Sequence, residues 1–515
     1  MKKLIALILV LVLCLSGCDV IDKVIGNIGG TQGGNGGGSD VTDCAAHTDL
    51  DDNGVCDICR QTVIVVIDLY AINDLHGKVN ESDSQPGIAG LTTYLRTVSG
   101  NDAVLLSTGD MWQGSSESNL THGALVTDWM NELGFVSMTL GNHEYDWGEE
   151  HIANNAELAD FPFLAINVYD KSTNQRAEYA TPSVIVSRGG IEIGIIGAIG
   201  DCYSSISGEV SGDFYFKVGD ELTELVKEES ERLKAQGVEF IVYSIHDGYG
   251  SSSSGTRYVN DRDIASYYDT ELSADYVDVV FEAHTHQSYI LSDSKGVYHL
   301  QGGGENTGLS HAKLRYNIAN ENKSVGAPEL IKASVYENMF KSPLIATLLE
   351  KYDELIAPAY KVLGNNYRYR DDSEVEQIVA DLYYQYGAEK WGEEYDVILG
   401  GGFIRTRNPY NLKSGDVTYS DIYSLLPFDN EIVLCSIKGR DLYNKFIDSD
   451  NSDYYISYGN NDISNIDFAK TYYIVTDTYT STYKYNNLTE VARYGTAIYA
   501  RDLFAELVES GGLGL

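Results

Sequence analysis

The stretch FVSMTLGNHEYDWG, residues 135–148, joins an apolar run to a group of polar side chains enclosed by two glycines. Its first six residues predict a short buried strand. The rest supplies an amide, an imidazole and two carboxylates, from Asn142, His143, Glu144 and Asp146. A surface turn accounts for Gly141 and Asn142 alone. The imidazole and the carboxylates, placed directly after a strand, therefore indicate one part of a site that other segments complete.

Four other runs of the chain end in the same way. From residue 62 onward, short β-branched runs alternate with helical stretches such as 89–97 and 219–236, a pattern that predicts an α/β fold. The polar residues that follow these runs are Asp74 and His76, then Asp110, then His246, and last His284 and His286. Ligands of α/β sheets bind beyond the carboxyl ends of the strands. We therefore expect these groups to meet Asn142 and His143 at one edge of a sheet.

This combination of side chains is typical of a metal centre. Carboxylate, imidazole and amide oxygen atoms are ligands of divalent cations, and a carboxylate such as Asp110 can bridge two of them. Two metal ions about 3.5–4 Å apart clamp the attacking and leaving oxygens of a phosphoryl transfer and activate a water. His143 then remains to protonate the leaving group, and Asp146 is placed to orient its imidazole.

The order of the motifs NDLHG, GD, GNHE, a strand-end histidine and HTH resembles that of calcineurin-like metallophosphoesterases, and more narrowly that of the 5'-nucleotidase family. The resemblance covers about residues 62–515. It implies a four-layer α/β/β/α sandwich followed by a second, substrate-binding α/β domain. It also implies two divalent metal ions of the zinc or manganese class. Their ligands would be Asp74, His76, Asp110 and His286 for one ion, and Asp110, Asn142, His246 and His284 for the other.

The residues around these ligands follow the family with one departure. His143 and Asp146 match its catalytic pair. Ala283 stands where the family usually has glycine before the H-x-H motif, which adds one methyl group. The resemblance thus implies hydrolysis of a phosphate ester by a metal-activated water.

The chain after the metal motifs is expected to form a second domain. Residues 336–363 have an amphipathic helical pattern that we expect to link a catalytic domain, 62–335, to a C-terminal nucleotide-binding domain, 364–515. The segments GGGFIRTR and SLLPFDN resemble parts of the substrate-binding domain of 5'-nucleotidases.

The resemblance assigns substrate contacts within this second domain. It implies that Phe428 stacks on the base and that Arg405, assisted by Arg407, contacts the phosphate or ribose. Many family members hold the base between two aromatic rings, the second of which follows a Gly-Gly-Asp-Gly stretch. This chain has VTDTYTSTYKYNNLTE, residues 475–490, in place of that stretch. We expect Tyr483 to take that position, with Tyr479 and Tyr485 as alternatives.

The start of the chain predicts export. Two lysines precede twelve apolar residues, 4–15, a run too short to cross a bilayer as a helix. The sequence LSGC then resembles the lipobox of bacterial lipoproteins, which implies cleavage of a signal peptide, 1–17, and acylation of Cys18. Residues 18–43 form a Gly-rich tether. We therefore expect an extracytoplasmic protein anchored to the membrane; an ordinary secretory signal is the alternative.

Residues 44–60 predict a small accessory knuckle. Cys44, His47, Cys56 and Cys59 have the spacing C-x2-H-x8-C-x2-C, which can supply a tetrahedral zinc site. The same segment resembles the first part of a calcium loop through Asp49, Asp51, Asn53 and Asp57, although Arg60 stands where that loop has glutamate. A disulfide with one spare thiol is the third alternative. We expect a structural metal here.

Composition limits the classes of function. The formal net charge of −40 excludes a general nucleic-acid binder and disfavours peripheral binding to anionic lipid. We expect a monomer that binds no nucleic acid duplex and releases phosphate from nucleoside 5'-monophosphates. A 2',3'-cyclic-nucleotide phosphodiesterase with 3'-nucleotidase activity, or a nucleotide-sugar pyrophosphatase, is the alternative. A non-catalytic nucleotide-binding lipoprotein is more distant, because no expected metal ligand is missing.

Overall fold

Parallel strands whose carboxyl ends share one edge place the polar motifs together. The computed structural model describes residues 47–81, 86–100, 103–206, 212–249, 275–293, 295–406, 411–448, 454–485, 487–493 and 495–513, except for the side chains of Ser204 and Tyr483. The chain divides into two units, Met1–Val63 and Ile64–Leu515.

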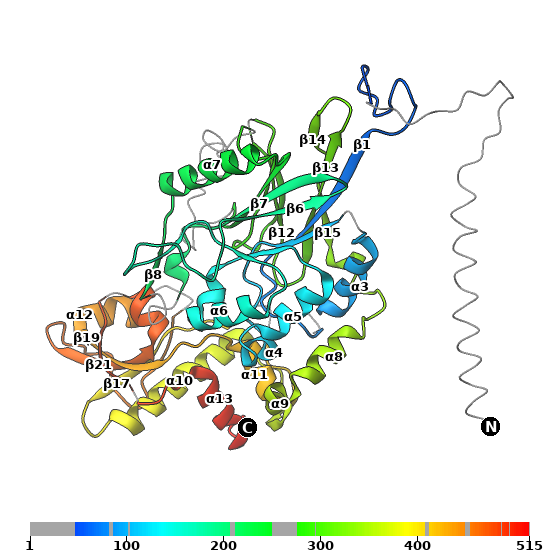
Figure 1. Ribbon diagram of the computed structural model, residues 1–515. Helices are drawn as coiled ribbons and strands as arrows, with labels where there is room; N and C mark the ends of the chain where they lie inside the picture. Colours follow the sequence, from blue (N-terminus) through cyan, green and yellow to red (C-terminus); the bar gives the residue numbers. More distant parts are fainter. Residues whose placement is uncertain are drawn as a thin grey trace, which may run out of the picture. The chain divides into compact units, whose positions relative to one another are not determined.

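The larger unit contains a seven-stranded sheet built from two stretches of the chain (Figure 1). Its order is β14 (Lys323–Val325), β13 (Gly308–Asn317), β1 (Ile64–Ile72), β2 (Val104–Ser107), β3 (Ser137–Thr139) and β4 (Phe163–Leu164), with β15 (Glu329–Lys332) beside β13. The neighbours β1, β2, β3 and β4 are parallel. The turns that follow β1, β2 and β3 therefore lie at the same edge of the sheet.

A second sheet of six strands supplies the remaining turns. Its order is β11 (Ser288–Ser292), β12 (Tyr298–Gly302), β10 (Val279–Phe281), β9 (Phe240–His246), β7 (Ile191–Ile199) and β6 (Ser183–Arg188). The strands β7, β9, β10 and β12 run parallel to one another. His246 ends β9, and the HTH motif follows β10.

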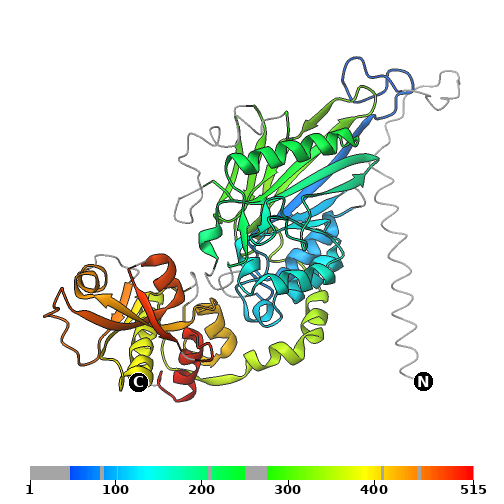
Figure 2. The same ribbon diagram turned by 60° about the vertical axis from the view of Figure 1, so that its left-hand side comes forward.

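The two sheets pack face to face and helices cover both outer faces (Figures 1 and 2). Alternate residues of β1, such as Leu69, pack between the sheets against Ile195 and Val242, whereas Tyr70 points to the opposite face. The covering helices are α3 (Ile88–Val98), α5 (Ala124–Leu133) and α6 (Glu149–Leu158) on the first sheet, and α7 (Asp220–Ala235) on the second. This arrangement confirms the predicted four-layer α/β/β/α fold.

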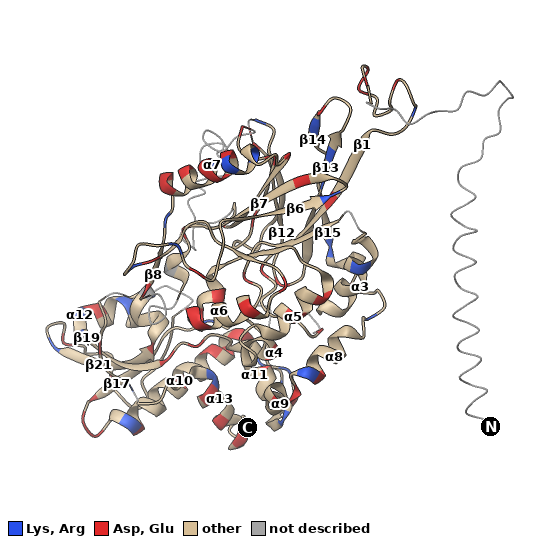
Figure 3. Cartoon of the chain, viewed as in Figure 1, with Lys and Arg blue, Asp and Glu red and all other residues tan. Residues whose placement is uncertain are grey.

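Short elements complete this part of the chain. They are α4 (Ser116–Leu120), the 3₁₀ turns η1 (Asn142–Tyr145), η2 (Tyr203–Ser205) and η5 (Ala333–Val335), and the small sheet of β5 (Val168–Asp170) with β8 (Phe214–Phe216). On the face seen in Figure 3, α6 carries acidic residues and no Lys or Arg, and α7 carries both acidic and basic residues. The charged residues of these two helices are therefore mostly acidic.

The segment expected to link two domains is helical. It contains α8 (Leu344–Lys351), α9 (Asp353–Ile356) and the 3₁₀ turn η6 (Ala357–Tyr360). Asp128 of α5 holds the end of α8, because it forms an ion pair with Lys351 and accepts a hydrogen bond from the Tyr352 hydroxyl at 2.6 Å. The first part of this segment is thus fixed to the metal-motif part of the unit.

A second α/β module follows. Its five-stranded sheet has the order β20 (Tyr454–Ser457), β17 (Val397–Phe403), β21 (Thr471–Asp477), β19 (Ile432–Lys438) and β22 (Thr489–Arg493). The helices are α10 (Asp372–Trp391), α11 (Tyr419–Leu425), α12 (Gly439–Leu442) and α13 (Ala500–Glu509), with the π-helical turns η7 (Tyr443–Ile447) and η8 (Thr480–Lys484) and the pair β16 (Val362–Asn366) and β18 (Gly415–Thr418). One face of the sheet packs on α10 and α13, as the core pair Val475 and Phe504 illustrates.

The smaller unit is described from residue 47 onward. It is a loop closed by an antiparallel bridge between Val55 and Thr62, beside which the Val63 N–H donates to the Gly54 carbonyl at 3.0 Å. Among the described residues of the whole chain, no helix combines the length and the apolar character that crossing a membrane requires.

Candidate metal centre

The turns after five strands bring the predicted ligands together in strained backbone conformations. Asp74, Asp110, Asn142 and His246 are fully or almost fully buried. The residues with left-handed backbone are Asp74 (φ 47°), His76 (φ 52°), Asp110 (φ 54°), His284 (φ 67°) and His286 (φ 55°). Such a conformation costs a non-glycine residue about 1–3 kcal/mol and is retained where the surrounding structure demands it. Here it turns side chains from separate strands toward one place.

One group of donors consists of Asp74, His76 and His286, whose ligand atoms lie within 4.8 Å of one another. The Nε2 atoms of the two histidines are 3.0 Å apart, and His286 Nε2 lies 3.5 Å from Asp74 Oδ1. His76 Nδ1 lies 2.8 Å from the Gln113 carbonyl oxygen, which can only accept a hydrogen bond. His76 therefore carries its proton on Nδ1 and directs the lone pair of Nε2 at the group.

The second group consists of Asp110, His246 and His284. His246 Nε2 lies 3.1 Å from both Asp110 Oδ2 and Asn142 Oδ1. Its Nδ1–H donates to the Thr108 carbonyl at 2.8 Å, so Nε2 again faces the group with a lone pair. Asp110 also belongs to a cluster with His76 and His143, which places its carboxylate between the two groups.

These donors fit divalent cations. His284 Nε2 and Asn142 Nδ2 are buried without a hydrogen-bond partner among the described residues. At His246, a lone pair, a carboxylate oxygen and an amide oxygen converge, and such acceptors repel one another unless a cation or a proton lies between them. Burial opposes a charged imidazole, but the Asp110 carboxylate outweighs it and raises the pKa of His246 to about 10. The group thus demands positive charge, which metal ions would supply.

His143 and Asp146 form the pair expected from the sequence. Asp146 Oδ2 lies 2.8 Å from His143 Nδ1, and the opposite ring nitrogen, Nε2, lies 4.0 Å from Asp110 Oδ2. The His143 N–H donates to Asp110 Oδ1 at 2.8 Å. The imidazole is therefore anchored on one side by a carboxylate and presents its other nitrogen to the metal groups.

Glu144 ties two of the turns to each other. Its carboxylate accepts hydrogen bonds from the N–H groups of Asp110 and Met111, both at 2.8 Å, and of Gly141 at 2.7 Å. Burial raises its pKa to about 7, and the nearby charge of Asp110 acts in the same direction. Glu144 thereby fixes the turn after β2 relative to the turn after β3.

Sequence reasoning missed other supporting residues. Asn73 donates to Asp74 Oδ2 at 2.7 Å and accepts from the Gly302 N–H at 3.1 Å. Glu282, one residue before Ala283, is buried and lies 2.9 Å from His299 Nδ1. The position of Asn73 within the NDLHG motif could have identified it as a supporting residue. Glu282 and His299 lie 17 residues apart, and no motif of the sequence links them.

The Pro-Phe element of the second module lies beside the metal groups. The ring of Phe428 is 6.0 Å from that of His143, with 33° between the planes. The Pro427 carbonyl accepts from Gln113 Nε2 at 3.0 Å and from Asn119 Nδ2 at 3.3 Å. Arg501, which the sequence did not single out, donates to the Phe428 carbonyl at 2.9 Å.

The other expected substrate contacts lie in different surroundings. Arg405 is exposed, and Tyr479 lies 6.0 Å from Phe403, ring to ring. Tyr485 is only 4% exposed and packs in the core against Phe446, so it has no open face for a base. Arg407, the side chain of Tyr483, and the N-terminal cysteines Cys18 and Cys44 lie outside the described residues.

Comparison with known proteins gives the family. The family model of the calcineurin-like phosphoesterases matches residues 67–288, and that of the 5'-nucleotidase C-terminal domain matches residues 356–469. An apyrase of Tabanus yao is 26% identical over 429 residues, covering 74% of this chain and 72% of its own. A 5'-nucleotidase of Vibrio cholerae is 24% identical over 416 residues, covering 72% and 73%.

Solved structures agree on the fold. A putative 5'-nucleotidase from Staphylococcus aureus, solved in complex with alpha-ketoglutarate, superposes with a TM-score of 0.66 at 17% identity and covers 87% of this chain and 98% of its own. The two family models follow one another along the chain as the motifs predicted. The chain therefore belongs to the 5'-nucleotidase family of calcineurin-like phosphoesterases and is a phosphoric ester hydrolase.

Proposed function

We propose that this chain releases phosphate from nucleoside 5'-monophosphates, outside the cytoplasm and with two divalent metal ions of the zinc or manganese class. One observation carries the proposal: Phe428 lies 6.0 Å from His143, ring to ring, at the edge of the donor groups joined by Asp110. A group able to stack on a base and a group able to handle phosphate are thus adjacent.

The metal groups define where the phosphate would bind. Asp74, His76, Asp110 and His286 would hold one ion, and Asp110, Asn142, His246 and His284 the other. Two such ions would polarise the phosphate, neutralise its charge and activate the attacking water. This positive charge is needed locally, because a chain of net charge −40 would otherwise repel an anionic substrate.

The protein's own groups would complete the reaction. His143 would donate a proton from Nε2 to the departing ribose 5'-oxygen, which is a poor leaving group as an alkoxide. Asp146, 2.8 Å from Nδ1, would keep the imidazole oriented and stabilise its protonated form. Glu144 would hold the turn that carries Asn142 and His143 against the turn that carries Asp110.

Phe428 would bind the base through one face of its ring. The centroid of its ring lies 6.0 Å from that of His143, which is the distance of an aromatic pair in contact. A base stacked on this ring would lie next to His143 and the donor groups. Arg405, Arg407 and Tyr483 are proposed to take the remaining phosphate, ribose and base contacts, as the family resemblance implies.

The proposal is tested by phosphate release from the purified chain supplied with manganese, zinc or cobalt. The panel contains 5'- and 3'-monophosphates, a 2',3'-cyclic nucleotide, a nucleotide sugar, and ADP and ATP, since one relative is named an apyrase. We expect the highest kcat/KM for 5'-monophosphates and no release after chelation. A clear preference for the cyclic nucleotide or the nucleotide sugar would contradict the substrate while leaving the metal chemistry intact.

The extracytoplasmic position is a separate part of the proposal. Removal of residues 1–17 and acylation of Cys18 would leave the catalytic part on a tether of residues 18–43. Membrane fractions of producing cells, probed for the chain with and without Cys18→Ala, test this directly. We expect the wild-type chain to carry fatty acid and to be found in the membrane fraction, and the variant to lack the fatty acid and to leave that fraction. Equal behaviour of the two proteins would remove the anchor from the proposal.

We also propose the division of the chain into a catalytic domain, 62–335, a linker, 336–363, and a C-terminal domain, 364–515.

A further inference from the structure

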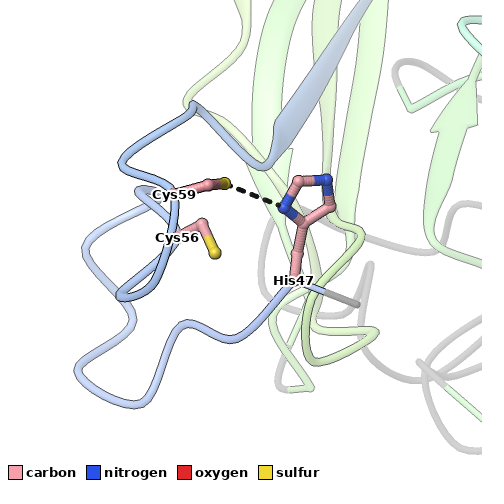
Figure 4. Close-up of side chains that lie close together, drawn as sticks. All are labelled: His47, Cys56 and Cys59. Atoms are coloured by element: carbon pink, nitrogen blue, oxygen red, sulfur yellow. Dashed lines mark hydrogen bonds between the residues drawn. The ribbon is translucent and has the colours of Figure 1, made fainter. Parts of the chain in front are cut away.

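The loop of the smaller unit gathers one imidazole and two thiols that the hydrolase chemistry does not use. The ligand atoms of His47, Cys56 and Cys59 lie within 4.8 Å of one another, and His47 Nδ1 is 3.4 Å from Cys59 Sγ (Figure 4). Bond lengths of about 2.3 Å for Zn–S and 2.0–2.1 Å for Zn–N separate sulfur and nitrogen by about 3.6 Å in a tetrahedral site. The observed spacing is close to that value.

The backbone around the cysteines is shaped to present both sulfurs. The Arg60 N–H donates to the Cys56 carbonyl at 2.9 Å, which closes a turn over the C-x2-C segment. The Thr48 N–H points at Cys56 Sγ from 3.5 Å. An N–H group directed at sulfur favours the thiolate, which is the form that binds metals. Cys56 and Cys59 are both buried and form no disulfide.

Little else in the loop explains its order. Of the apolar side chains between His47 and Cys59, Leu50 and Ile58 are 91% and 68% exposed, and Val55 is half-buried. What the loop buries instead is the sulfur of Cys56 and Cys59, together with Asp49. A short segment without an apolar core needs a cross-link or a metal to fix its conformation.

We propose that Cys56, Cys59 and His47 bind a structural zinc ion that holds residues 47–63 in their fold. Two thiolates and an imidazole are soft and borderline ligands, which select zinc over calcium, magnesium or manganese. Cys44, the fourth ligand expected from the spacing, lies outside the described residues, and the proposal rests on the other three. It is independent of the catalytic metals, because the catalytic donor groups contain no cysteine.

The carboxylates of Asp49 and Asp57 accept hydrogen bonds from backbone N–H groups of the loop. The Asp49 carboxylate accepts from the N–H groups of Asn53 at 3.0 Å and Gly54 at 2.8 Å. Asp57 Oδ2 accepts from the Leu50 N–H at 2.8 Å. These oxygens therefore satisfy the backbone of the loop, and among the described residues the candidate metal-binding group of this loop contains no carboxylate. The carboxylates shape the loop, and the sulfurs and imidazole hold the ion.

Cobalt provides the test, because it reports whether sulfur is a ligand. The full mature chain is loaded with Co²⁺ in reducing buffer, and the near-ultraviolet sulfur-to-cobalt charge-transfer band is recorded for wild type, Cys59→Ala and Cys435→Ala. Cys435 is a matched control, since it is also buried and free but lies in strand β19. Zinc content is measured on the same three proteins, and phosphate release is measured alongside.

We expect the band in wild type and Cys435→Ala, its loss in Cys59→Ala, and about one zinc ion fewer per chain in that variant. Phosphate release should be the same in all three, which separates this site from the catalytic one. A wild-type protein without the band would overturn the proposal. So would non-reducing mass analysis showing Cys56 and Cys59 joined in a disulfide with zinc content unchanged in Cys59→Ala, or loop-bound calcium that is lost only in Asp49→Asn.

Discussion

Asp110 is the residue on which both donor groups depend. Its Oδ2 lies 3.1 Å from His246 Nε2 and 4.0 Å from His143 Nε2, and its Oδ1 accepts from the His143 N–H at 2.8 Å. Charge from the surrounding histidines overcomes the effect of burial and holds the pKa of this carboxyl well below its usual range. A permanently ionised carboxylate at this point is what a bridge between two cations requires.

Asp110→Asn should therefore abolish turnover and lower the occupancy of both catalytic metals, because one neutral amide oxygen cannot bridge two cations. Metal content by elemental analysis and phosphate release from AMP measure the two effects on one preparation. Asp396→Asn, at an exposed carboxylate between α10 and β17, is the control and should change neither. An active Asp110→Asn protein with full metal content would refute the bridging role.

His143→Ala should behave differently, because His143 is placed beside the metal groups with Asp146 at 2.8 Å rather than as a shared ligand. We expect the metals to remain and kcat for nucleotides to fall by about 10²–10⁴-fold, the usual value of general acid help. The loss should be smallest for 4-nitrophenyl phosphate, whose leaving group needs no proton. Equal losses on both substrates would leave His143 with an electrostatic role only.

At the scale of elements, the site is a set of strand ends held together by the turns that follow them. The predicted helices at 89–97 and 219–236 correspond to α3 and α7, and the polar residues after β1, β2, β3, β9 and β10 converge as expected. The alternation of β-branched runs with helical stretches and the shared edge of parallel strands made this predictable.

The backbone geometry of the turns was not predictable in the same way. Non-glycine residues such as Asp74 and His284 give no sequence signal for left-handed backbone. The contact that fixes the tautomer of His76 comes from the main-chain carbonyl of Gln113, which every residue possesses. Tyr479, Tyr483 and Tyr485 look alike in sequence, and only tertiary packing places Tyr485 in a core. Sequence periodicity locates elements, whereas these details depend on contacts between them.

The turn after β3 gives a test at this scale. A Cβ atom at Gly141 would lie 2.1 Å from Asp110 Oδ1 and 2.6 Å from Asp110 N, although the φ of Gly141, −104°, is open to any residue. Gly141→Ala should thus push the β3 turn away from the β2 turn and lower kcat/KM and metal content together. Gly100→Ala, where a Cβ meets nothing within 4 Å, is the matched control. Unchanged activity in Gly141→Ala would mean that the turns tolerate displacement.

At the scale of the whole chain, two modules with separate cores meet beside the donor groups. The second module contributes Pro427 and Phe428, and the first holds them through Gln113 and Asn119 at 3.0 and 3.3 Å from the Pro427 carbonyl. Gln113 is also the residue whose carbonyl fixes His76 at 2.8 Å. The contact that positions the Pro-Phe element is therefore linked through one residue to a metal donor, which no single motif of the sequence foretold.

Phe428→Ala tests whether the second module delivers the base to this shared site. Stacking on an aromatic ring contributes about 1–3 kcal/mol per base, and energy from this remote contact would be used to position the phosphate. We expect a higher KM for nucleotides and a kcat/KM reduced roughly 10–100-fold, with a far smaller change for 4-nitrophenyl phosphate, which has no base.

The choice of control decides how that result is understood. Phe468→Ala removes a half-exposed phenylalanine of the same module that pairs with Tyr443, and it should leave both substrates unaffected. The ring centroid of Phe428 also lies 6.0 Å from that of His143. Loss of the Phe428 ring can therefore disturb the imidazole and slow the hydrolysis of both substrates alike. Equal loss would thus assign Phe428 to the support of His143 and place base binding elsewhere. A selective loss on nucleotides is the result that follows if the ring of Phe428 holds the base.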